Sequence, residues 1–148
     1  MSGALAHSPA DILRYLLIDL GHGTLPSDGA LWPIYESQEP NLPDNVITTY
    51  NTTNVHQGRV MSDGEVQERY GIQIRVRATT ELIAFVKSQA ITISLDQDVY
   101  LKGVTINGSG YLVHAVSRIS GPMSIGKETP DSKRDLFTIN VTAAIRQS

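Results

Sequence analysis

Four histidines and two pairs of aspartates are the side chains in this sequence whose types could support acid–base or metal chemistry. The histidines are His7, His22, His56 and His114. No two of them stand four residues apart, and none has a carboxylate at the spacing of a metal site. The aspartate pairs are Asp96 with Asp98 and Asp131 with Asp135. Both pairs flank expected loops, where carboxylates are usually solvated rather than tuned for catalysis. The sequence therefore predicts no catalytic centre, no metal site and no cofactor.

A row of polar and cationic side chains, Gln73, Arg75 and Arg77, is the strongest candidate for a functional surface. The stretch around the row alternates between apolar and polar residues, and successive side chains of a strand point to opposite faces. We expect the row to lie on the outer face and to contact another molecule. The alternative interpretation is a solvated face with ion pairs to Glu36 or Glu39, since exposed salt bridges contribute only ~0–1 kcal/mol.

The alternating stretch, residues 67–80, predicts the central strand of the fold. Its inner face would carry the apolar side chains Tyr70, Ile72, Ile74, Val76 and Ala78. Thr79 and Thr80 then offer an N-cap, and the apolar spacing changes from two to three and four. We expect a helix over about residues 81–95. Its buried face would consist of Leu82, Ile83, Val86, Ala90 and Ile93.

Patterning elsewhere predicts another helix and several strands. Ser8 as N-cap, Pro9 at the first helical position and a following apolar stripe indicate an amphipathic helix that ends at Gly21. Strands are expected at residues 34–37, 46–50, 104–106, 111–119 and 136–145. Two polar, turn-rich stretches, 51–65 and 121–134, are expected to be long loops. The sequence therefore predicts a single α+β domain over residues 1–148.

Composition argues against several classes of function. The formal net charge is −3, whereas a protein that holds nucleic acid by its phosphates normally carries clustered positive charge. There are no cysteines, which excludes a disulfide framework and a thiolate zinc site. The sequence begins without the features of a signal peptide, and no apolar stretch approaches membrane-spanning length. We expect a protein made inside a cell and used there, or assembled there into something larger.

Several short motifs occur in a definite order after the first helix. They are PDNVIT at residues 43–48, GIQIRVRA at 71–78, SGP at 120–122 and FTINV at 137–141. Over about residues 8–147, this order resembles the minor capsid or tail terminator proteins of long-tailed bacteriophages. The resemblance implies a mixed, mostly antiparallel sheet with two helices packed on it.

The resemblance also implies a structural virion protein rather than an enzyme. Such proteins form a ring, typically of about six copies, which closes the head-proximal end of the tail tube and joins it to the neck. The expected partners are copies of the chain, the tail tube protein and the head–neck connector protein, in a virion assembled in the host cytoplasm. DNA would pass through the ring without specific binding, and a mildly acidic subunit suits this because basic walls would hold the phosphates. No membrane is expected to be involved.

The expected subunit or partner contacts combine the polar row with apolar residues of the two expected loops. They are Gln73, Arg75, Arg77, Val60, Met61, Met123 and Ile125. We expect residues 51–65 to become ordered only on assembly, because a polar segment cannot offset its ordering entropy without a partner surface.

Two other classes of function remain open. One is a different neck component, such as a head-completion or stopper protein, which would bind capsids rather than tail tubes. The other is a small-ligand-binding or enzymatic α+β domain unrelated to phage. That class requires a pocket with convergent polar groups, of which the sequence gives no indication.

Overall fold

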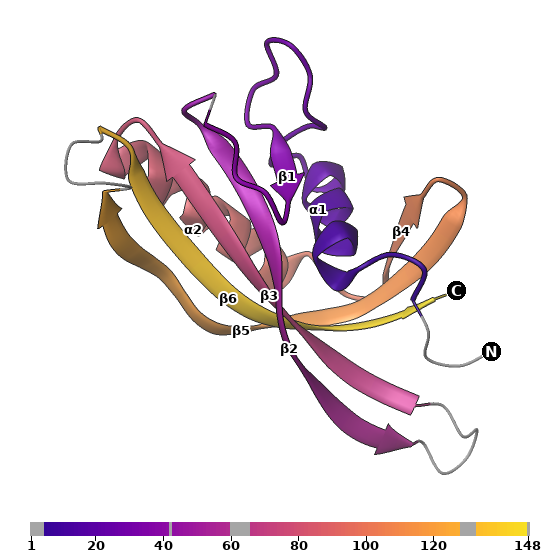
Figure 1. Cartoon of the computed structure of the whole chain (residues 1–148). Helices are drawn as coiled ribbons and strands as arrows, with labels where there is room; N and C mark the ends of the chain where they lie inside the picture. The colour runs from indigo at the N-terminus through magenta and orange to yellow at the C-terminus, as the bar shows by residue number, and fades with distance from the viewer. Residues whose placement is uncertain (1–4, 42, 60–65, 128–132, 148) are drawn as a thin grey trace.

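A curled sheet forms the frame of the molecule, and the helices pack against it (Figure 1). The computed structural model describes residues 5–41, 43–59, 66–127 and 133–147, with the backbone alone for 53–59 and 66–68. The elements in these ranges are α1 (Pro9–Asp19), β1 (Ile34–Glu36), β2 (Val46–Arg59), β3 (Val66–Ala78), α2 (Glu81–Gln97), β4 (Lys102–Ile106), β5 (Ser109–Lys127) and β6 (Asp135–Gln147).

The described strands form one six-stranded sheet in the order β1-β2-β3-β6-β5-β4. β1 pairs with β2 in parallel, and the other neighbours are antiparallel. One cluster of buried side chains joins both helices to the inner face of β3, so both helices cover the same face of the sheet. The predicted α+β class, with two helices on a mixed, mostly antiparallel sheet, is confirmed.

β3 lies at the centre of the sheet, as its alternation predicts. The side chains predicted to face inward are all at most 7% exposed: Tyr70, Ile72, Ile74, Val76 and Ala78. β3 pairs with β6 from Arg69 opposite Ala144 to Ala78 opposite Asp135, with no shift of register. These two strands therefore hold the middle of the core in a fixed register. Alternation is enough to specify this register, because a slip of one residue would turn every apolar side chain of the strand outward.

α1 begins as its capping residues predict. Ser8 Oγ accepts a hydrogen bond from the Asp11 amide at 3.2 Å, and Pro9 occupies the first turn. Two contacts then fix the helix start to β2: the Ala10 amide donates to Asn51 Oδ1 at 2.9 Å, and Thr49 Oγ1 donates to the Ala10 carbonyl at 2.8 Å. The predicted helix and its buried apolar stripe are confirmed.

α2 begins where predicted but turns a different face to the sheet. Thr80 Oγ1 accepts from the Ile83 amide at 3.2 Å and caps the helix. The sheet-facing side chains are Ala84, Ser88, Ile91, Thr92 and Leu95. The predicted buried face is wrong, because Leu82, Ile83, Val86, Ala90 and Ile93 are all exposed.

Small side chains explain which face of α2 meets the sheet. Ala84, Ser88 and Thr92 follow one another at intervals of four, on one side of the helix. The Ser88 hydroxyl donates to the Ala84 carbonyl at 2.7 Å and the Thr92 hydroxyl to the Ser88 carbonyl at 2.9 Å, so both polar groups are satisfied inside the core. This row of small side chains, with Ile91 and Leu95 beside it, forms the sheet-facing side and leaves Leu82, Val86 and Ile93 outside.

The two expected long loops are largely strands. β2 continues to Arg59 and β5 to Lys127, each with register shifts that accommodate irregular pairing. The prediction is therefore wrong for residues 51–59 and 121–127. Residues 51–59 belong to the hairpin that projects from the body of the molecule, and residues 121–127 are partly or fully exposed, so neither segment carries the alternation of a half-buried strand. The rest of the expected loops, at 60–65 and 128–132, lies outside the described residues, and Val60 and Met61 with it.

Replacing Ile74 by Asp should reduce the free energy of unfolding by at least ~3 kcal/mol, because an unpaired carboxylate would occupy the centre of the core. Urea denaturation measures the loss. Leu31, which is 83% exposed, provides the control, and Leu31→Asp should change stability by less than about 0.5 kcal/mol. An unchanged stability of the Ile74 variant would show that the strand faces are assigned wrongly.

Candidate interaction surfaces

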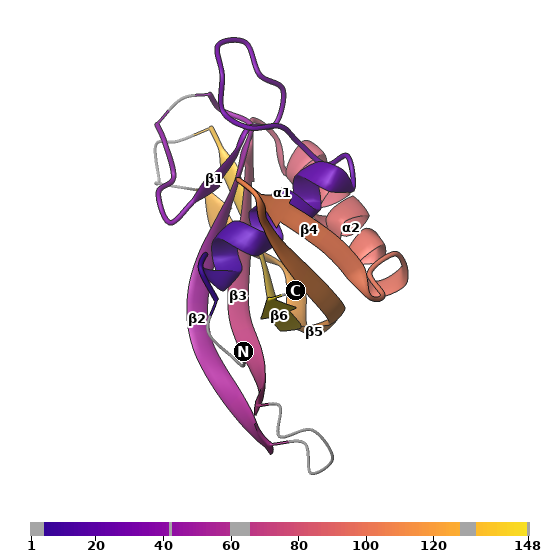
Figure 2. The ribbon, with the colours of Figure 1, turned by 90° about the vertical axis from the view of Figure 1, so that its right-hand side faces the viewer.

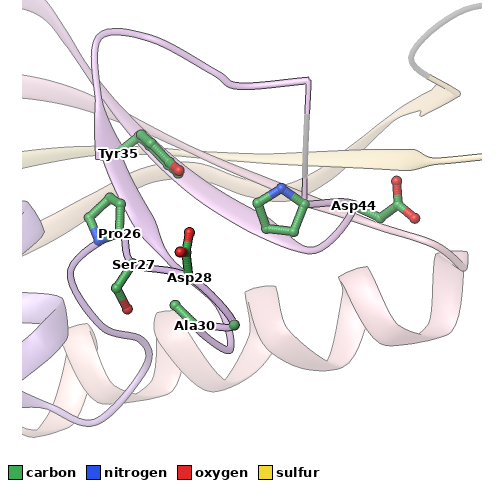
Figure 3. Close-up of a pocket in the computed structure, with 8 residues that line it drawn as sticks. Pro26, Ser27, Asp28, Ala30, Tyr35 and Asp44 are labelled. Carbon is green, nitrogen blue, oxygen red and sulfur yellow. The ribbon is translucent and has the colours of Figure 1, made fainter.

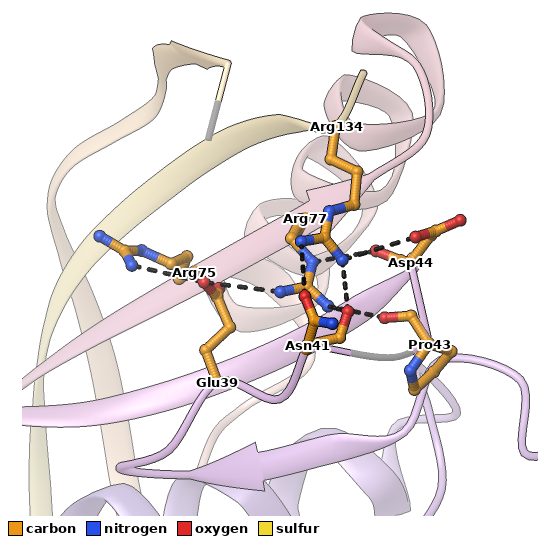
Figure 4. Close-up of polar contacts among 7 residues, drawn as sticks. All are labelled: Glu39, Asn41, Pro43, Asp44, Arg75, Arg77 and Arg134. Atoms are coloured by element: carbon orange, nitrogen blue, oxygen red, sulfur yellow. Dashed lines mark hydrogen bonds and ion pairs between the residues drawn. The ribbon is translucent and has the colours of Figure 1, made fainter. Parts of the chain in front are cut away.

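Arg77 does not belong to an exposed cationic row. It lies on the outer face of β3, as alternation predicts, but its side chain is only 2% exposed. Its guanidinium donates to the main-chain carbonyls of Asp44 at 3.2 Å, Pro43 at 2.6 Å and Asn41 at 3.3 Å (Figure 4). Arg77 therefore faces outward as predicted, but the expectation that it is exposed is wrong, because a crossing segment of the chain covers this part of the sheet.

The described part of the covering segment is residues 37–41 and 43–45, between β1 and the parallel strand β2, and the chain must return along the sheet to join these strands. Glu39 carries an ion pair to each arginine of the row, at 3.6 Å to Arg75 and 3.8 Å to Arg77. Arg134, just before β6, donates to the carbonyl and side-chain oxygens of Asn41. The segment, called here the crossover, is therefore held by two cations of β3 and by Arg134, which precedes β6.

The row thus divides into residues with different surroundings. Arg75 keeps 31% of its side chain exposed and pairs with Glu39, as the alternative interpretation of the row proposes. Gln73 Nε2 donates to Asn140 Oδ1 at 3.4 Å, and Asn140 Nδ2 donates to Ser120 Oγ at 3.0 Å. These side chains bridge β3, β6 and β5 on the outer face. Sequence reasoning missed Arg134 and the crossover, for which prolines at 40 and 43 signal only a broken strand.

A hollow of about 710 Å³ lies beside the crossover (Figure 3). Its lining residues are Pro26, Ser27, Asp28, Gly29, Ala30, Tyr35, Pro43 and Asp44. Asp44 also lies 3.5 Å from the Arg134 guanidinium, so this carboxylate helps to fix the crossover. Among the described residues, no group of three or more histidine, aspartate or glutamate side chains could hold a metal ion. The hollow is lined by loop residues and by Tyr35 of β1.

His22 links the two helices. Its side chain is buried at the end of α1, and its Nε2 lies 2.8 Å from Ser94 Oγ of α2. Burial lowers the pKa of His22 below its usual value of 6.5, the nearby Lys87 lowers this pKa further, and Asp98 partly opposes the shift. The neutral imidazole is therefore part of the helix–helix contact.

Two patches of apolar side chains are exposed. The first, called the helix patch, consists of Leu82 (69% exposed), Val86 (54%), Ala90 and Ile93 (47%) on the outward side of α2. The second, called the strand patch, consists of Ile119 (66%), Met123 (49%) and Ile125 (42%) on β5. The predicted contact residues Met123 and Ile125 therefore lie at the surface. The residues of the helix patch are the ones whose helical spacing is visible in the sequence. The sequence does not reveal that these residues face outward.

Two strand edges also lack partners within the described part of the chain. β1 pairs with β2 only at residues 47–49, and β4 pairs with β5 only at 109–113. The outer edges of residues 50–59 of β2 and 115–127 of β5 are thus open in the described residues. The hairpin of β2 and β3 projects from the body of the molecule, at the lower right of Figure 1.

Comparisons with known proteins found no matching family model and no matching curated protein. None of the described helices combines the length and the apolar character needed to cross a membrane.

Replacing Arg77 by Met should lower the free energy of unfolding by about 3 kcal/mol, because it removes the buried guanidinium that donates to three carbonyls of the crossover and leaves Glu39 with Arg75 alone. Arg75→Met is the matched control, and its loss should stay below about 1 kcal/mol because that guanidinium is partly solvated. Urea denaturation compares the two variants. Equal losses would contradict a special role of Arg77 in holding the crossover.

Stability should fall as the pH drops from 7 to 5. The folded-state pKa of His22 is lowered, so the unfolded chain binds more protons in this window and folding loses free energy as pH falls. Chemical denaturation at several pH values measures the slope, which His22→Gln should reduce. A slope as steep in that variant as in the wild type would show that His22 is not its source.

Proposed function

We propose that this protein is a tail terminator of a long-tailed bacteriophage. Copies of the chain would form a ring, of about six by the resemblance, which closes the head-proximal end of the tail tube and joins it to the neck. Its partners would be the tail tube protein on one side and the head–neck connector protein on the other. The protein would be located in the virion, which is assembled in the host cytoplasm.

The open strand edges of the described residues carry this proposal. Monomeric proteins usually blunt or cover a long strand edge, because its unpaired amide and carbonyl groups recruit other chains. Here the edges at 50–59 and 115–127 belong to β2 and β5, on opposite sides of the central pair β3–β6. Two different surfaces on opposite sides of a subunit favour head-to-tail association, which gives a ring when the rotation closes.

The remaining chemistry suits such a ring. A structural subunit requires no reacting groups, so the proposal accounts for a chain in which neither the sequence nor the described hollow suggests catalysis. The net charge of −3 would let DNA slide through the lumen, since basic walls would bind its phosphates.

Electron microscopy of the purified protein with isolated tail tubes tests the proposal. We expect rings in the protein alone at high concentration, and an added density at one end of each tube. DNA-filled capsids that lack tails are the matched control particle. Binding to capsids but not to tubes would favour a stopper protein instead, and a protein that binds neither would contradict any role at this junction.

A further inference from the structure

α2 is apolar on both sides, which its position in the monomer does not require. A helix in the outer layer of a domain normally carries polar residues on its outward side, and one that is apolar all round is normally buried. The helix patch has residues at spacings of four, four and three, which forms a continuous stripe opposite the sheet-facing side. α2 lies at the right-hand margin of the molecule in Figure 2, in the outermost layer. Something outside the subunit should therefore cover the stripe.

The charges at the ends of α2 limit which kind of surface can cover the helix patch. Glu81 lies at its start, and Asp96 and Asp98 lie at its end, all of them exposed. If two helix patches met in antiparallel orientation, Glu81 of one copy would approach Asp96 of the other. Like charges brought together in this way are unfavourable and act against a wrong partner. The complementary surface should instead be apolar with basic ends.

The strand patch has this character. Its exposed apolar side chains lie between Arg118 and Lys127, and residues 117–127 contain no carboxylate. The helix patch extends about 16 Å at the rise of an α-helix. Residues 118–126 of β5 lie opposite residues 136–141 of β6 because of the register shifts, so the strand patch lies within about 17 Å at the rise of a strand. The two stripes therefore match in length, in apolar character and in the sign of the flanking charges.

The basic residues of the strand patch already have partners within the subunit. Arg118 lies 3.7 Å from Asp96, with side chains that are 42% and 38% exposed, and Lys127 lies 3.4 Å from Asp135, whose side chain is only 12% exposed. An exposed pair such as Arg118–Asp96 contributes only ~0–1 kcal/mol. Arg118 can therefore turn to a neighbouring carboxylate at little cost, whereas Lys127 stays with the buried Asp135 and lends its positive charge to the end of the patch.

We propose that the helix patch of one copy packs on the strand patch of the next copy. The inference rests on the proposed ring and names the residues of its subunit contact. Because the two patches are different surfaces, the contact is head-to-tail and every copy uses both. It also covers the side chains beside the open edge of β5.

Two glutamate variants of the full chain test the contact. Val86→Glu removes the helix patch and Met123→Glu the strand patch, and both positions are exposed, so each subunit should keep its fold and its melting temperature. Light scattering after size-exclusion chromatography should show at least a tenfold weaker association for each variant. Leu31→Glu, at an exposed apolar residue in neither patch, should assemble as the wild type does.

Mixing the two variants identifies the partner surfaces. The Val86→Glu subunit retains its strand patch and the Met123→Glu subunit its helix patch, so an equimolar mixture should form dimers that cannot grow further. A mixture that stays monomeric would overturn the head-to-tail contact. Variants that assemble like the wild type would overturn it as well, yet leave the ring intact. If the mixture gives dimers but wild-type rings do not bind tail tubes, the contact stands and the tail terminator proposal fails.

Discussion

The pairing of β3 with β6 is the constraint on which the rest of the molecule depends. The two strands run side by side without a register shift, from Arg69 opposite Ala144 to Ala78 opposite Asp135. Their inner side chains are buried against both helices. Since a strand sends alternate side chains to opposite faces, this pairing also sends Arg75 and Arg77 outward. Part of that outer face is then covered by the crossover, whose carbonyl groups satisfy the buried guanidinium of Arg77.

Much of the fold could be predicted because its elements depend on local patterns. The alternation of residues 67–80 identifies a half-buried strand, and Ser8 and Thr80 mark helix starts that the structure confirms. The segments 51–59 and 121–127 could not be recognised as strands. The first segment lies in the projecting hairpin and the second is partly or fully exposed, so alternation is not imposed on either. Their glycine and polar residues look the same in a loop as in an irregular edge strand.

The surfaces were harder to predict because they depend on contacts between distant segments. Alternation places Arg77 on the outer face, but it contains no information about the crossover, which folds over this arginine. The apolar stripe of α2 is present in the sequence, yet the helix has apolar or small residues on both sides. Which side meets the sheet is decided by how closely Ala84, Ser88 and Thr92 allow the helix to approach, and this is a property of packing rather than of periodicity.

The central claim is that the outward side of α2 is covered by another copy of the chain. Hydrogen exchange, measured below and above the concentration at which the protein assembles, tests it most directly. The expected result is slower exchange of the α2 amides in the assembled protein, because a packed neighbour raises the free energy of local opening. Residues 70–78 of β3, which are inside the core in both states, should change little. Equal exchange of α2 in the two states would contradict the claim.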